Sequence, residues 1–160
     1  MPLTPKPPSA CATEMVQVVL PNDTNPMGFM LGGAVMHLID IAAAIAAFRH
    51  AHELMVTAAV DGLEFLNPIK VGDFIVLKAR VTGVFTTSLE VEVTVFSEEA
   101  LTGRRQMTSR AHLTFVTLPR DGTRAQIPPL LVESDEEKRQ QTEAAVRRTE
   151  RLARRAKLGV

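Results

Sequence analysis

The sequence predicts an α+β fold in which an antiparallel sheet curls around one long central helix, with a second helix near the C-terminus. Three observations support this fold class: an apolar stretch of helical length, four later segments in which apolar and polar residues alternate, and a charged segment that closes the chain. Strands joined by short turns pair antiparallel, and one helix cannot cover both faces of their sheet. We therefore expect at least a dimer that joins two sheets edge to edge.

The N-terminal third of the chain predicts a disordered lead, a short strand, a loop and the central helix. Residues 1–12 include four prolines and form the expected lead, and residues 13–20 (TEMVQVVL) have the composition of a strand. Eight turn-forming residues lie between Pro21 and Gly33, so we expect the chain to bend repeatedly before the helix begins near Ala34. Small side chains would let the sheet approach this helix closely: Ala42, Ala43, Ala44, Ala46 and Ala47.

Four strands are predicted from the alternation that follows the helix. Residues 88–96 (SLEVEVTVF) place apolar side chains on one face and two glutamates on the other. The segments 73–81 and 105–116 repeat this pattern. The segment 56–66 does so too, except for a one-residue change of phase at Gly62 that indicates a β-bulge. Gly83 and residues 97–103 are the expected turns between the later strands.

The composition changes after Arg120, so we expect a main domain over residues 13–120 and a C-terminal extension over 121–160. Ser134 and Glu137 have the spacing of a capping box, and arginines gather toward the end of the same segment. A helix is therefore predicted over about 134–156. The arginines have two interpretations: a solvated helix face, or contact with phosphate groups or a neighbouring subunit.

Composition excludes several classes of function. Lysine plus arginine equals aspartate plus glutamate at 18 each, so no overall field attracts nucleic acid or an anionic membrane. The apolar run of the central helix is shorter than the roughly 20 residues that span a membrane. Cys11 is the only cysteine, so no disulfide framework forms, and its proline-rich surroundings offer nothing to activate a catalytic thiol. Because a signal-peptide pattern is also missing, we expect a cytoplasmic protein.

Asp40 is the residue of the central helix that needs an explanation. Apolar residues surround it in the sequence, and burial of its charge without compensation would destabilise the fold. Two interpretations are open: a structural aspartate that caps a loop amide, or a carboxylate held in a crevice to act on a substrate. His37 lies one turn earlier on the same side, but a third ligand is lacking nearby, so no metal site is predicted.

The loop before the helix favours the functional interpretation of Asp40. Asn25 carries both a donor and an acceptor, with which it could position a water or a carbonyl, although a lone loop asparagine is also typical of a turn. Gly32 and Gly33 allow close approach of a ligand, and the N–H groups of the helix start could stabilise an oxyanion. The sequence contains neither a phosphate-binding glycine loop nor a serine nucleophile elbow.

Five segments together resemble the hotdog-fold acyl-CoA thioesterases of the bacterial acyl-CoA hydrolase and brain acyl-CoA hydrolase type. In the family's order and spacing, between about Val18 and Pro119, they are PNDTNPMGFMLGGAVMHLID, AAAIAAFRH, VTAAVDGLEFLNPIKVGD, TTSLEVEV and TGRRQMTSRAHLTFV. The segment EEKRQQTEAAVRR is similar to the family's terminal helix, more weakly. His37 and the Met30–Leu31 pair fall where the family varies, so the resemblance does not fix the preferred acyl length.

This resemblance implies a hotdog dimer, often assembled into a trimer of dimers, that hydrolyses acyl-CoA to free CoA and a carboxylate. The family's catalytic pair is a loop asparagine and an acidic helix residue from opposite units, and these match Asn25 and Asp40. We expect Asp40 to activate water as a general base and Asn25 to orient that water or the thioester. Direct attack by Asp40, which would give an anhydride, is the open variant.

Further site residues are assigned from residue type. Thr57 and Ser88 could line the groove for the pantetheine arm. Four basic residues could reach the CoA phosphates: Arg49, Lys70, Arg104 and Arg105. CoA is then part of the substrate and product, and no separate cofactor is expected.

Two alternatives to the hydrolase stay open. A dehydratase or hydratase on the same fold would need a histidine near the helix start, for which His37 is the only candidate. A protein of another class would bind acyl-CoA without catalysis, as a sensor or binding module. Loss of activity in a folded Asp40 variant would argue against that second alternative.

Overall fold

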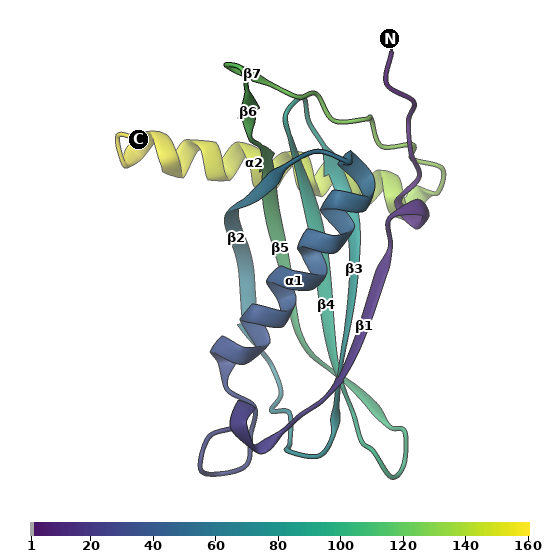
Figure 1. Ribbon diagram of the computed structural model, residues 1–160, viewed down its shortest axis with the longest axis vertical. Coiled ribbons are helices and arrows are strands. Elements are labelled where there is room, and N and C mark those ends of the chain that lie inside the picture. The colour runs from purple at the N-terminus through teal and green to yellow at the C-terminus, as the bar shows by residue number, and fades with distance from the viewer. Residues whose placement is uncertain (1) are drawn as a thin grey trace.

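A computed structural model describes residues 2–160, and its centre is a five-stranded antiparallel sheet wrapped around helix α1 (Gly32–Ala51) (Figure 1). The predicted fold class is therefore confirmed. The strand order is β1-β3-β4-β5-β2. The strands are β1 (Thr13–Val18), β2 (Met55–Phe65), β3 (Phe74–Val84), β4 (Ser88–Glu98) and β5 (Arg105–Thr117). Two 3-10 turns, η1 (Pro8–Ala10) and η2 (Pro21–Asp23), and a small hairpin, β6 (Pro119–Arg120) with β7 (Thr123–Arg124), complete the connections.

α1 lies against the inner face of the sheet and forms the hydrophobic core with it. Nine of its residues are buried, and four of the five predicted alanines are completely inaccessible: Ala42, Ala43, Ala46 and Ala47. Their small side chains let inward-facing strand residues such as Val91 and Leu113 pack close to the helix backbone. α1 is also the one helix of the described chain that is long and apolar enough to cross a membrane, but its packing is that of a core helix.

Edge strand β2 carries two irregularities that decide where its side chains point. Its register against β5 shifts between Thr57 and Ala59 and again between Asp61 and Glu64. Gly62 lies in the second shift with a φ of +64°, a conformation that glycine adopts without strain. The bulge predicted at Gly62 is therefore confirmed. The first shift was not predicted, and it leaves Thr57 directed at α1 while Ala59 lines a groove on the outer side.

Helix α2 (Asp135–Lys157) crosses the outer side of the sheet, opposite α1 (Figure 1). Gly83, predicted as a turn, instead lies inside β3, where α2 packs against the sheet. A Cβ added to Gly83 would lie 2.8 Å from the Cβ of Ala144, which is fully buried. The glycine therefore makes room for the helix and does not turn the chain.

Arginines of α2 attach the helix to this outer face. Arg147 donates two hydrogen bonds, of 2.9 and 2.8 Å, to the carboxylate of Glu90, which is only 2% exposed. Arg151 and Arg154 contact the carboxylate of Asp61 at 3.4 and 2.9 Å. The interpretation of the arginines as a solvated face is wrong for Arg147 and Arg151, whose side chains are only 22% and 16% exposed, whereas Arg154 stays largely exposed beside Asp61. The predicted capping box is confirmed between Ser134 and Glu137 at the helix start.

Residues 2–12 differ from the disordered lead that the sequence predicted, and Met1 lies outside the described residues. Lys6 forms a β-bridge with Leu130, and its Nζ donates to the carbonyl of His50 at 2.8 Å. Cys11 is buried in the core after η1. Prolines lack an N–H and have a fixed φ, so they suit an extended segment that lies along the domain as well as they suit a flexible one.

Candidate active site

Asp40 projects from the exposed side of α1 toward edge strand β2. Thr57 Oγ1 donates a hydrogen bond of 2.6 Å to Asp40 Oδ1. The expected burial of Asp40 is wrong for the single chain, because Ile39 turns into the core whereas Asp40 lies on the side of α1 that carries the exposed Met36 and His37. The carboxylate is therefore held at one oxygen and accessible at the other.

Asn25 is fixed in the loop between η2 and α1. Its Oδ1 accepts hydrogen bonds from the backbone N–H groups of Met27 (3.0 Å) and Phe29 (3.1 Å), and its own backbone N–H donates to the carbonyl of Phe29 at 2.8 Å. Because both side-chain bonds use the oxygen, the Nδ2 group keeps its two donors for a ligand. From the sequence, Asn25 could act toward a ligand as a hydrogen-bond donor or as an acceptor. In the structure its Oδ1 is already bonded, so Asn25 can act toward a ligand as a donor through Nδ2.

The start of α1 offers further donors. Leu31 occupies the N-cap position and gives no side-chain cap, so the N–H groups of the first turn lack a side-chain acceptor. Gly32 packs beneath the ring of Phe65, and a Cβ added to Gly32 would lie 3.2 Å from that ring. A Cβ added to Gly33 would meet no atom within 4 Å. Free donors and the positive end of the helix dipole suit a developing oxyanion. Gly33 presents the open approach to them.

These donors and Asp40 are separated within one chain. Gly32 and Asp40 lie eight residues apart, which corresponds to about 12 Å along the helix axis. A cavity of about 320 Å³ lies beside the helix start, with largely apolar walls that include Met30, Val35 and Phe65. Asn25 and the helix start thus form one half of a site, and Asp40 with Thr57 forms the other.

Ser88 is not part of either half. It lies on the outer side of the sheet, in a groove lined by arginines of α2, whereas Thr57 contacts Asp40 on the inner side. The structure therefore separates the two residues that were expected to line one groove. The contact between Thr57 and Asp40 could not be recognised from the sequence, because the register shift that directs Thr57 has no composition signal.

The four basic residues assigned to the CoA phosphates do not share a site. Lys70 and Arg104 line a common cavity of about 360 Å³, together with Asp73 and Glu99. Arg105 pairs with Glu98 at 3.5 Å. Arg49 donates to the carbonyl of Ala12 and to Thr13 Oγ1, and so holds the chain start to the end of α1.

His37 is exposed on α1, and nothing in residues 2–160 brings together three or more His, Cys, Asp or Glu side chains in a way that could hold a metal ion. That the reaction needs no metal ion stays a prediction.

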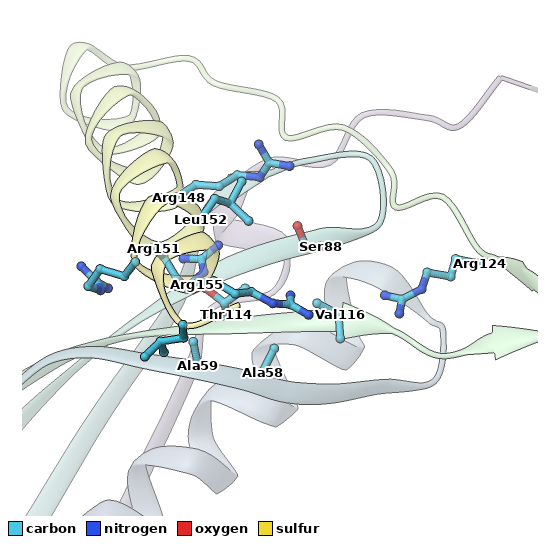
Figure 2. A pocket seen from close by; sticks show the side chains of 12 residues that line it. Ala58, Ala59, Ser88, Thr114, Val116, Arg124, Arg148, Arg151, Leu152 and Arg155 are labelled. Atoms are coloured by element: carbon cyan, nitrogen blue, oxygen red, sulfur yellow. The ribbon is translucent and has the colours of Figure 1, made fainter. Parts of the chain in front are cut away.

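Sequence reasoning noted the arginines of the C-terminal segment but missed the groove that they form together with Arg124 on the outer side of the sheet. Arg148, Arg151, Arg154 and Arg155 of α2 and Arg124 of β7 line one groove (Figure 2). The spacing of Arg148, Arg151 and Arg155 places all three on one side of a helix, and this was the available signal. The residues beneath them could not be foreseen, since they come from three separate strands.

An antiparallel sheet curled around one central helix is the hotdog fold, the fold of a class of thioester enzymes. Residues 27–104 match the family model of the thioesterase superfamily. The chain is 39% identical over 136 residues to an acyl-CoA thioester hydrolase of Bacillus subtilis, an alignment that covers 85% of this chain and 79% of that protein. This chain belongs to the acyl-CoA thioester hydrolases of the thioesterase superfamily.

Solved structures agree with this membership. The crystal structure of an apo-hexameric acyl-CoA thioesterase has a TM-score of 0.89 at 36% identity, with 96% of this chain and 99% of that chain covered. The acyl-CoA hydrolase of Staphylococcus aureus, solved in complex with butyryl-CoA, CoA and CoA disulfide, has a TM-score of 0.87 at 35% identity, with 96% and 94% covered.

Proposed function

We propose that this chain hydrolyses acyl-CoA thioesters to free CoA and a carboxylic acid, with Asp40 as the catalytic carboxylate. The observation that carries the proposal is the hydrogen bond from Thr57 to Asp40 Oδ1, on an exposed side of α1 next to an unpaired strand edge. One carboxylate oxygen is held by the hydroxyl, and the other is available to accept a proton from water.

The Staphylococcus aureus hydrolase supports the same three residues. Its solved structures include single alanine variants of an asparagine, an aspartate and a threonine, separated by 15 and then 17 positions. Asn25, Asp40 and Thr57 are separated by the same intervals in this chain.

In the proposed reaction, the free oxygen of Asp40 takes a proton from water as the water oxygen attacks the thioester carbonyl carbon. The N–H groups near Gly33 and the Nδ2 group of Asn25 donate to the resulting oxyanion. Collapse of this intermediate breaks the carbon–sulfur bond, and the proton held by Asp40 passes to the departing CoA thiolate. In the variant mechanism Asp40 attacks directly, and water then hydrolyses the anhydride.

We assign the two halves of each site to different protomers, so that the helix start of one chain faces Asp40 of the partner. The separation of about 12 Å within one chain supports this arrangement. So do the unpaired edge of β2 and the exposed apolar side chains of Met36, Val56 and Val60. A dimer is then the minimum unit, and the hexameric thioesterase of similar fold supports a trimer of dimers.

The test of the proposal is Asp40→Asn, which keeps the side-chain shape and removes the base. We expect kcat to fall at least about a hundredfold while circular dichroism and thermal unfolding stay those of the wild type. Asp135→Asn, a fully exposed carboxylate of α2, is the matched control and should keep full activity. A folded Asp40→Asn protein that loses less than about tenfold in kcat would remove Asp40 from the mechanism.

The same assay addresses the dehydratase alternative, with His37→Gln as the variant. A hydrolase of the proposed kind should keep its kcat in this variant, and neither protein should hydrate an enoyl-CoA. We further propose a cytoplasmic enzyme that needs neither a metal nor a separate cofactor.

A further inference from the structure

The cavity beside the start of α1 is lined by a serine whose hydroxyl group the fold does not use. Ser109 of β5 lines this cavity of about 320 Å³, and its side chain is completely buried. Within residues 2–160 its Oγ has no hydrogen-bond partner. Buried hydroxyl groups nearly always have a partner, and an unpaired one lowers the stability of the fold. The presence of a hydroxyl at this position therefore needs an explanation other than folding.

Ser109 lies on the inner side of the sheet, which faces α1. Ala111 and Leu113 follow it at alternate positions of β5, in a stretch that keeps its register against β4, and both belong to the hydrophobic core. Alternate residues of a strand share one face. The adjacent hydroxyl group is already used, because Thr108 Oγ1 donates to the carbonyl of Val95 at 3.1 Å. Ser109 thus brings an unused hydroxyl to the face on which the cavity lies.

The rest of the cavity wall is mostly apolar, with side chains from the loop before α1, from α1 and from the end of β2: Met30, Val35, Phe65, Leu66, Pro68 and Ile69. Phe65 is the register partner of Ser109 on the neighbouring strand, and its ring lies over Gly32. The ring therefore extends from the strand beside the serine to the start of α1. A ligand in this cavity meets apolar walls and few polar groups.

Asn67 supplies a second polar group to the cavity wall. Its Nδ2 donates to the carbonyl of Met107 at 2.9 Å, which fixes the amide group. The amide oxygen of Asn67 is an acceptor, whereas the hydroxyl of Ser109 both donates and accepts. A hydroxyl group on a ligand is suited to both residues, because it also donates and accepts.

We propose that Ser109 selects acyl groups that carry a hydroxyl group, so that short hydroxyacyl thioesters are the preferred substrates. The proposal rests on the proposed hydrolase function. Gly32 lines the cavity at the start of α1, where the thioester carbonyl meets the free N–H groups, so the acyl chain extends from there into the cavity. The volume is at the lower end of the range of ligand pockets, about 300–1,000 Å³, which favours a short chain.

The discrimination comes from what an unsubstituted chain leaves unpaired. A hydrocarbon chain fills the cavity but gives Ser109 Oγ no partner, whereas a hydroxyacyl chain supplies one. Sites that hydrogen-bond a hydroxyl group of the substrate discriminate against the analogue that lacks it. For one hydrogen bond between neutral groups we expect a preference of about tenfold.

Kinetics with butyryl-CoA, 3-hydroxybutyryl-CoA and 4-hydroxybutyryl-CoA test the proposal. The wild type should have a kcat/KM about tenfold higher for at least one hydroxy substrate than for butyryl-CoA, mainly through KM, because the bond to Ser109 forms when the substrate binds. Ser109→Ala should lower kcat/KM for that substrate about tenfold and leave the butyryl-CoA reaction unchanged or faster. Ser9→Ala, the same substitution at an exposed position, is the matched control and should behave as the wild type does.

Equal kcat/KM of the wild type for all three substrates, or a preference that persists in Ser109→Ala, would overturn the proposal. Urea unfolding gives a second readout. Ser109→Ala should unfold at a urea concentration no lower than the wild type does, because its hydroxyl has no partner in the fold. An alanine variant that is less stable, or that does not fold, would show that the hydroxyl has a structural role and would equally overturn the proposal.

Failure of the hydrolase proposal is distinguishable, because it would appear as absent turnover of all three thioesters. Calorimetry with the Asp40→Asn protein measures the binding of the same thioesters without turnover. This protein should bind the preferred hydroxybutyryl-CoA about tenfold more tightly than butyryl-CoA, and the double variant Asp40→Asn/Ser109→Ala should bind the two equally. Equal affinities already in the Asp40→Asn protein would count against selection by Ser109, whatever the outcome for hydrolysis.

Discussion

The hydroxyl of Thr57 lies 2.6 Å from Oδ1 of Asp40 and joins the edge strand of the sheet to the central helix. The register shift after Thr57 gives the side chain this direction, since the residue would otherwise follow the regular alternation of β2. A hydrogen bond to one carboxylate oxygen fixes the plane of the group. The bulge in the strand thereby decides where the free oxygen of Asp40 points.

Replacement of Thr57 by valine tests this positioning role. Valine keeps the branched shape but cannot donate, so we expect kcat to fall by about tenfold or more with little change in KM. Thr57→Ser restores a hydroxyl and should recover most of the activity. A valine variant with wild-type kcat would show that Asp40 needs no orientation by Thr57, and a serine variant as inactive as valine would indicate a packing role instead.

A second prediction concerns the contact between Gly83 and Ala144, where α2 meets the sheet. Gly83→Ala brings two Cβ atoms to 2.8 Å, and both are attached to rigid backbone, so the helix must shift. Overpacking of this kind typically costs about 1–3 kcal/mol of unfolding free energy. Urea unfolding measures the loss.

The double variant Gly83→Ala/Ala144→Gly supplies the control for that prediction. It removes the clash and should be more stable than the sum of the two single variants implies. Ala145→Gly, at an exposed position of α2, reports the cost of a glycine in this helix alone. Additive effects of the two single variants would mean that the side chains at 83 and 144 do not meet.

Several features of the fold could be predicted because their signals are local. Gly62 broke a regular alternation, and Ser134 with Glu137 had the spacing of a cap. Glu90 shows the limit of such signals: alternation placed it on a polar face, but Arg147, 57 residues later, covers that face. Asp40 shows the same limit, since its exposure depends on which helix side meets the sheet. The alternation of apolar and polar residues within a segment does not show which distant segment will contact it.

His50 predicts how stability changes with pH. Its ring is completely buried, with Nε2 2.8 Å from the carbonyl of Pro128 and Nδ1 3.8 Å from Cys11 Sγ. Burial lowers the pKa of His50 below its ordinary 6.5, and the charges of Lys6 and His52 act in the same direction, while the bond to Pro128 opposes them. The unfolded chain therefore binds this proton more readily, and stability should fall as the pH drops below about 6.5.

His50→Gln checks this contribution. Glutamine can keep the bond to Pro128 but does not titrate, so the wild type should lose more stability than the variant between about pH 7.5 and about pH 5.5. Urea unfolding at the two pH values gives the comparison, and His52→Gln, at an exposed position, is the control. Parallel losses in wild type and His50→Gln would assign the acid sensitivity to other groups.

The last prediction is that active sites are shared between subunits. Asn25→Ala and Asp40→Asn should each be inactive alone, because every site of either homodimer lacks one essential group. When the two chains are refolded together at equal amounts, about half of random dimers are mixed, and each has one site with both lesions and one site with neither. Activity should therefore return to about a quarter of the wild-type value.

Native mass spectrometry verifies that mixed dimers form. If they form and activity does not return, Asn25 and Asp40 act within the same chain, and the separation of about 12 Å along α1 must be bridged by the substrate itself.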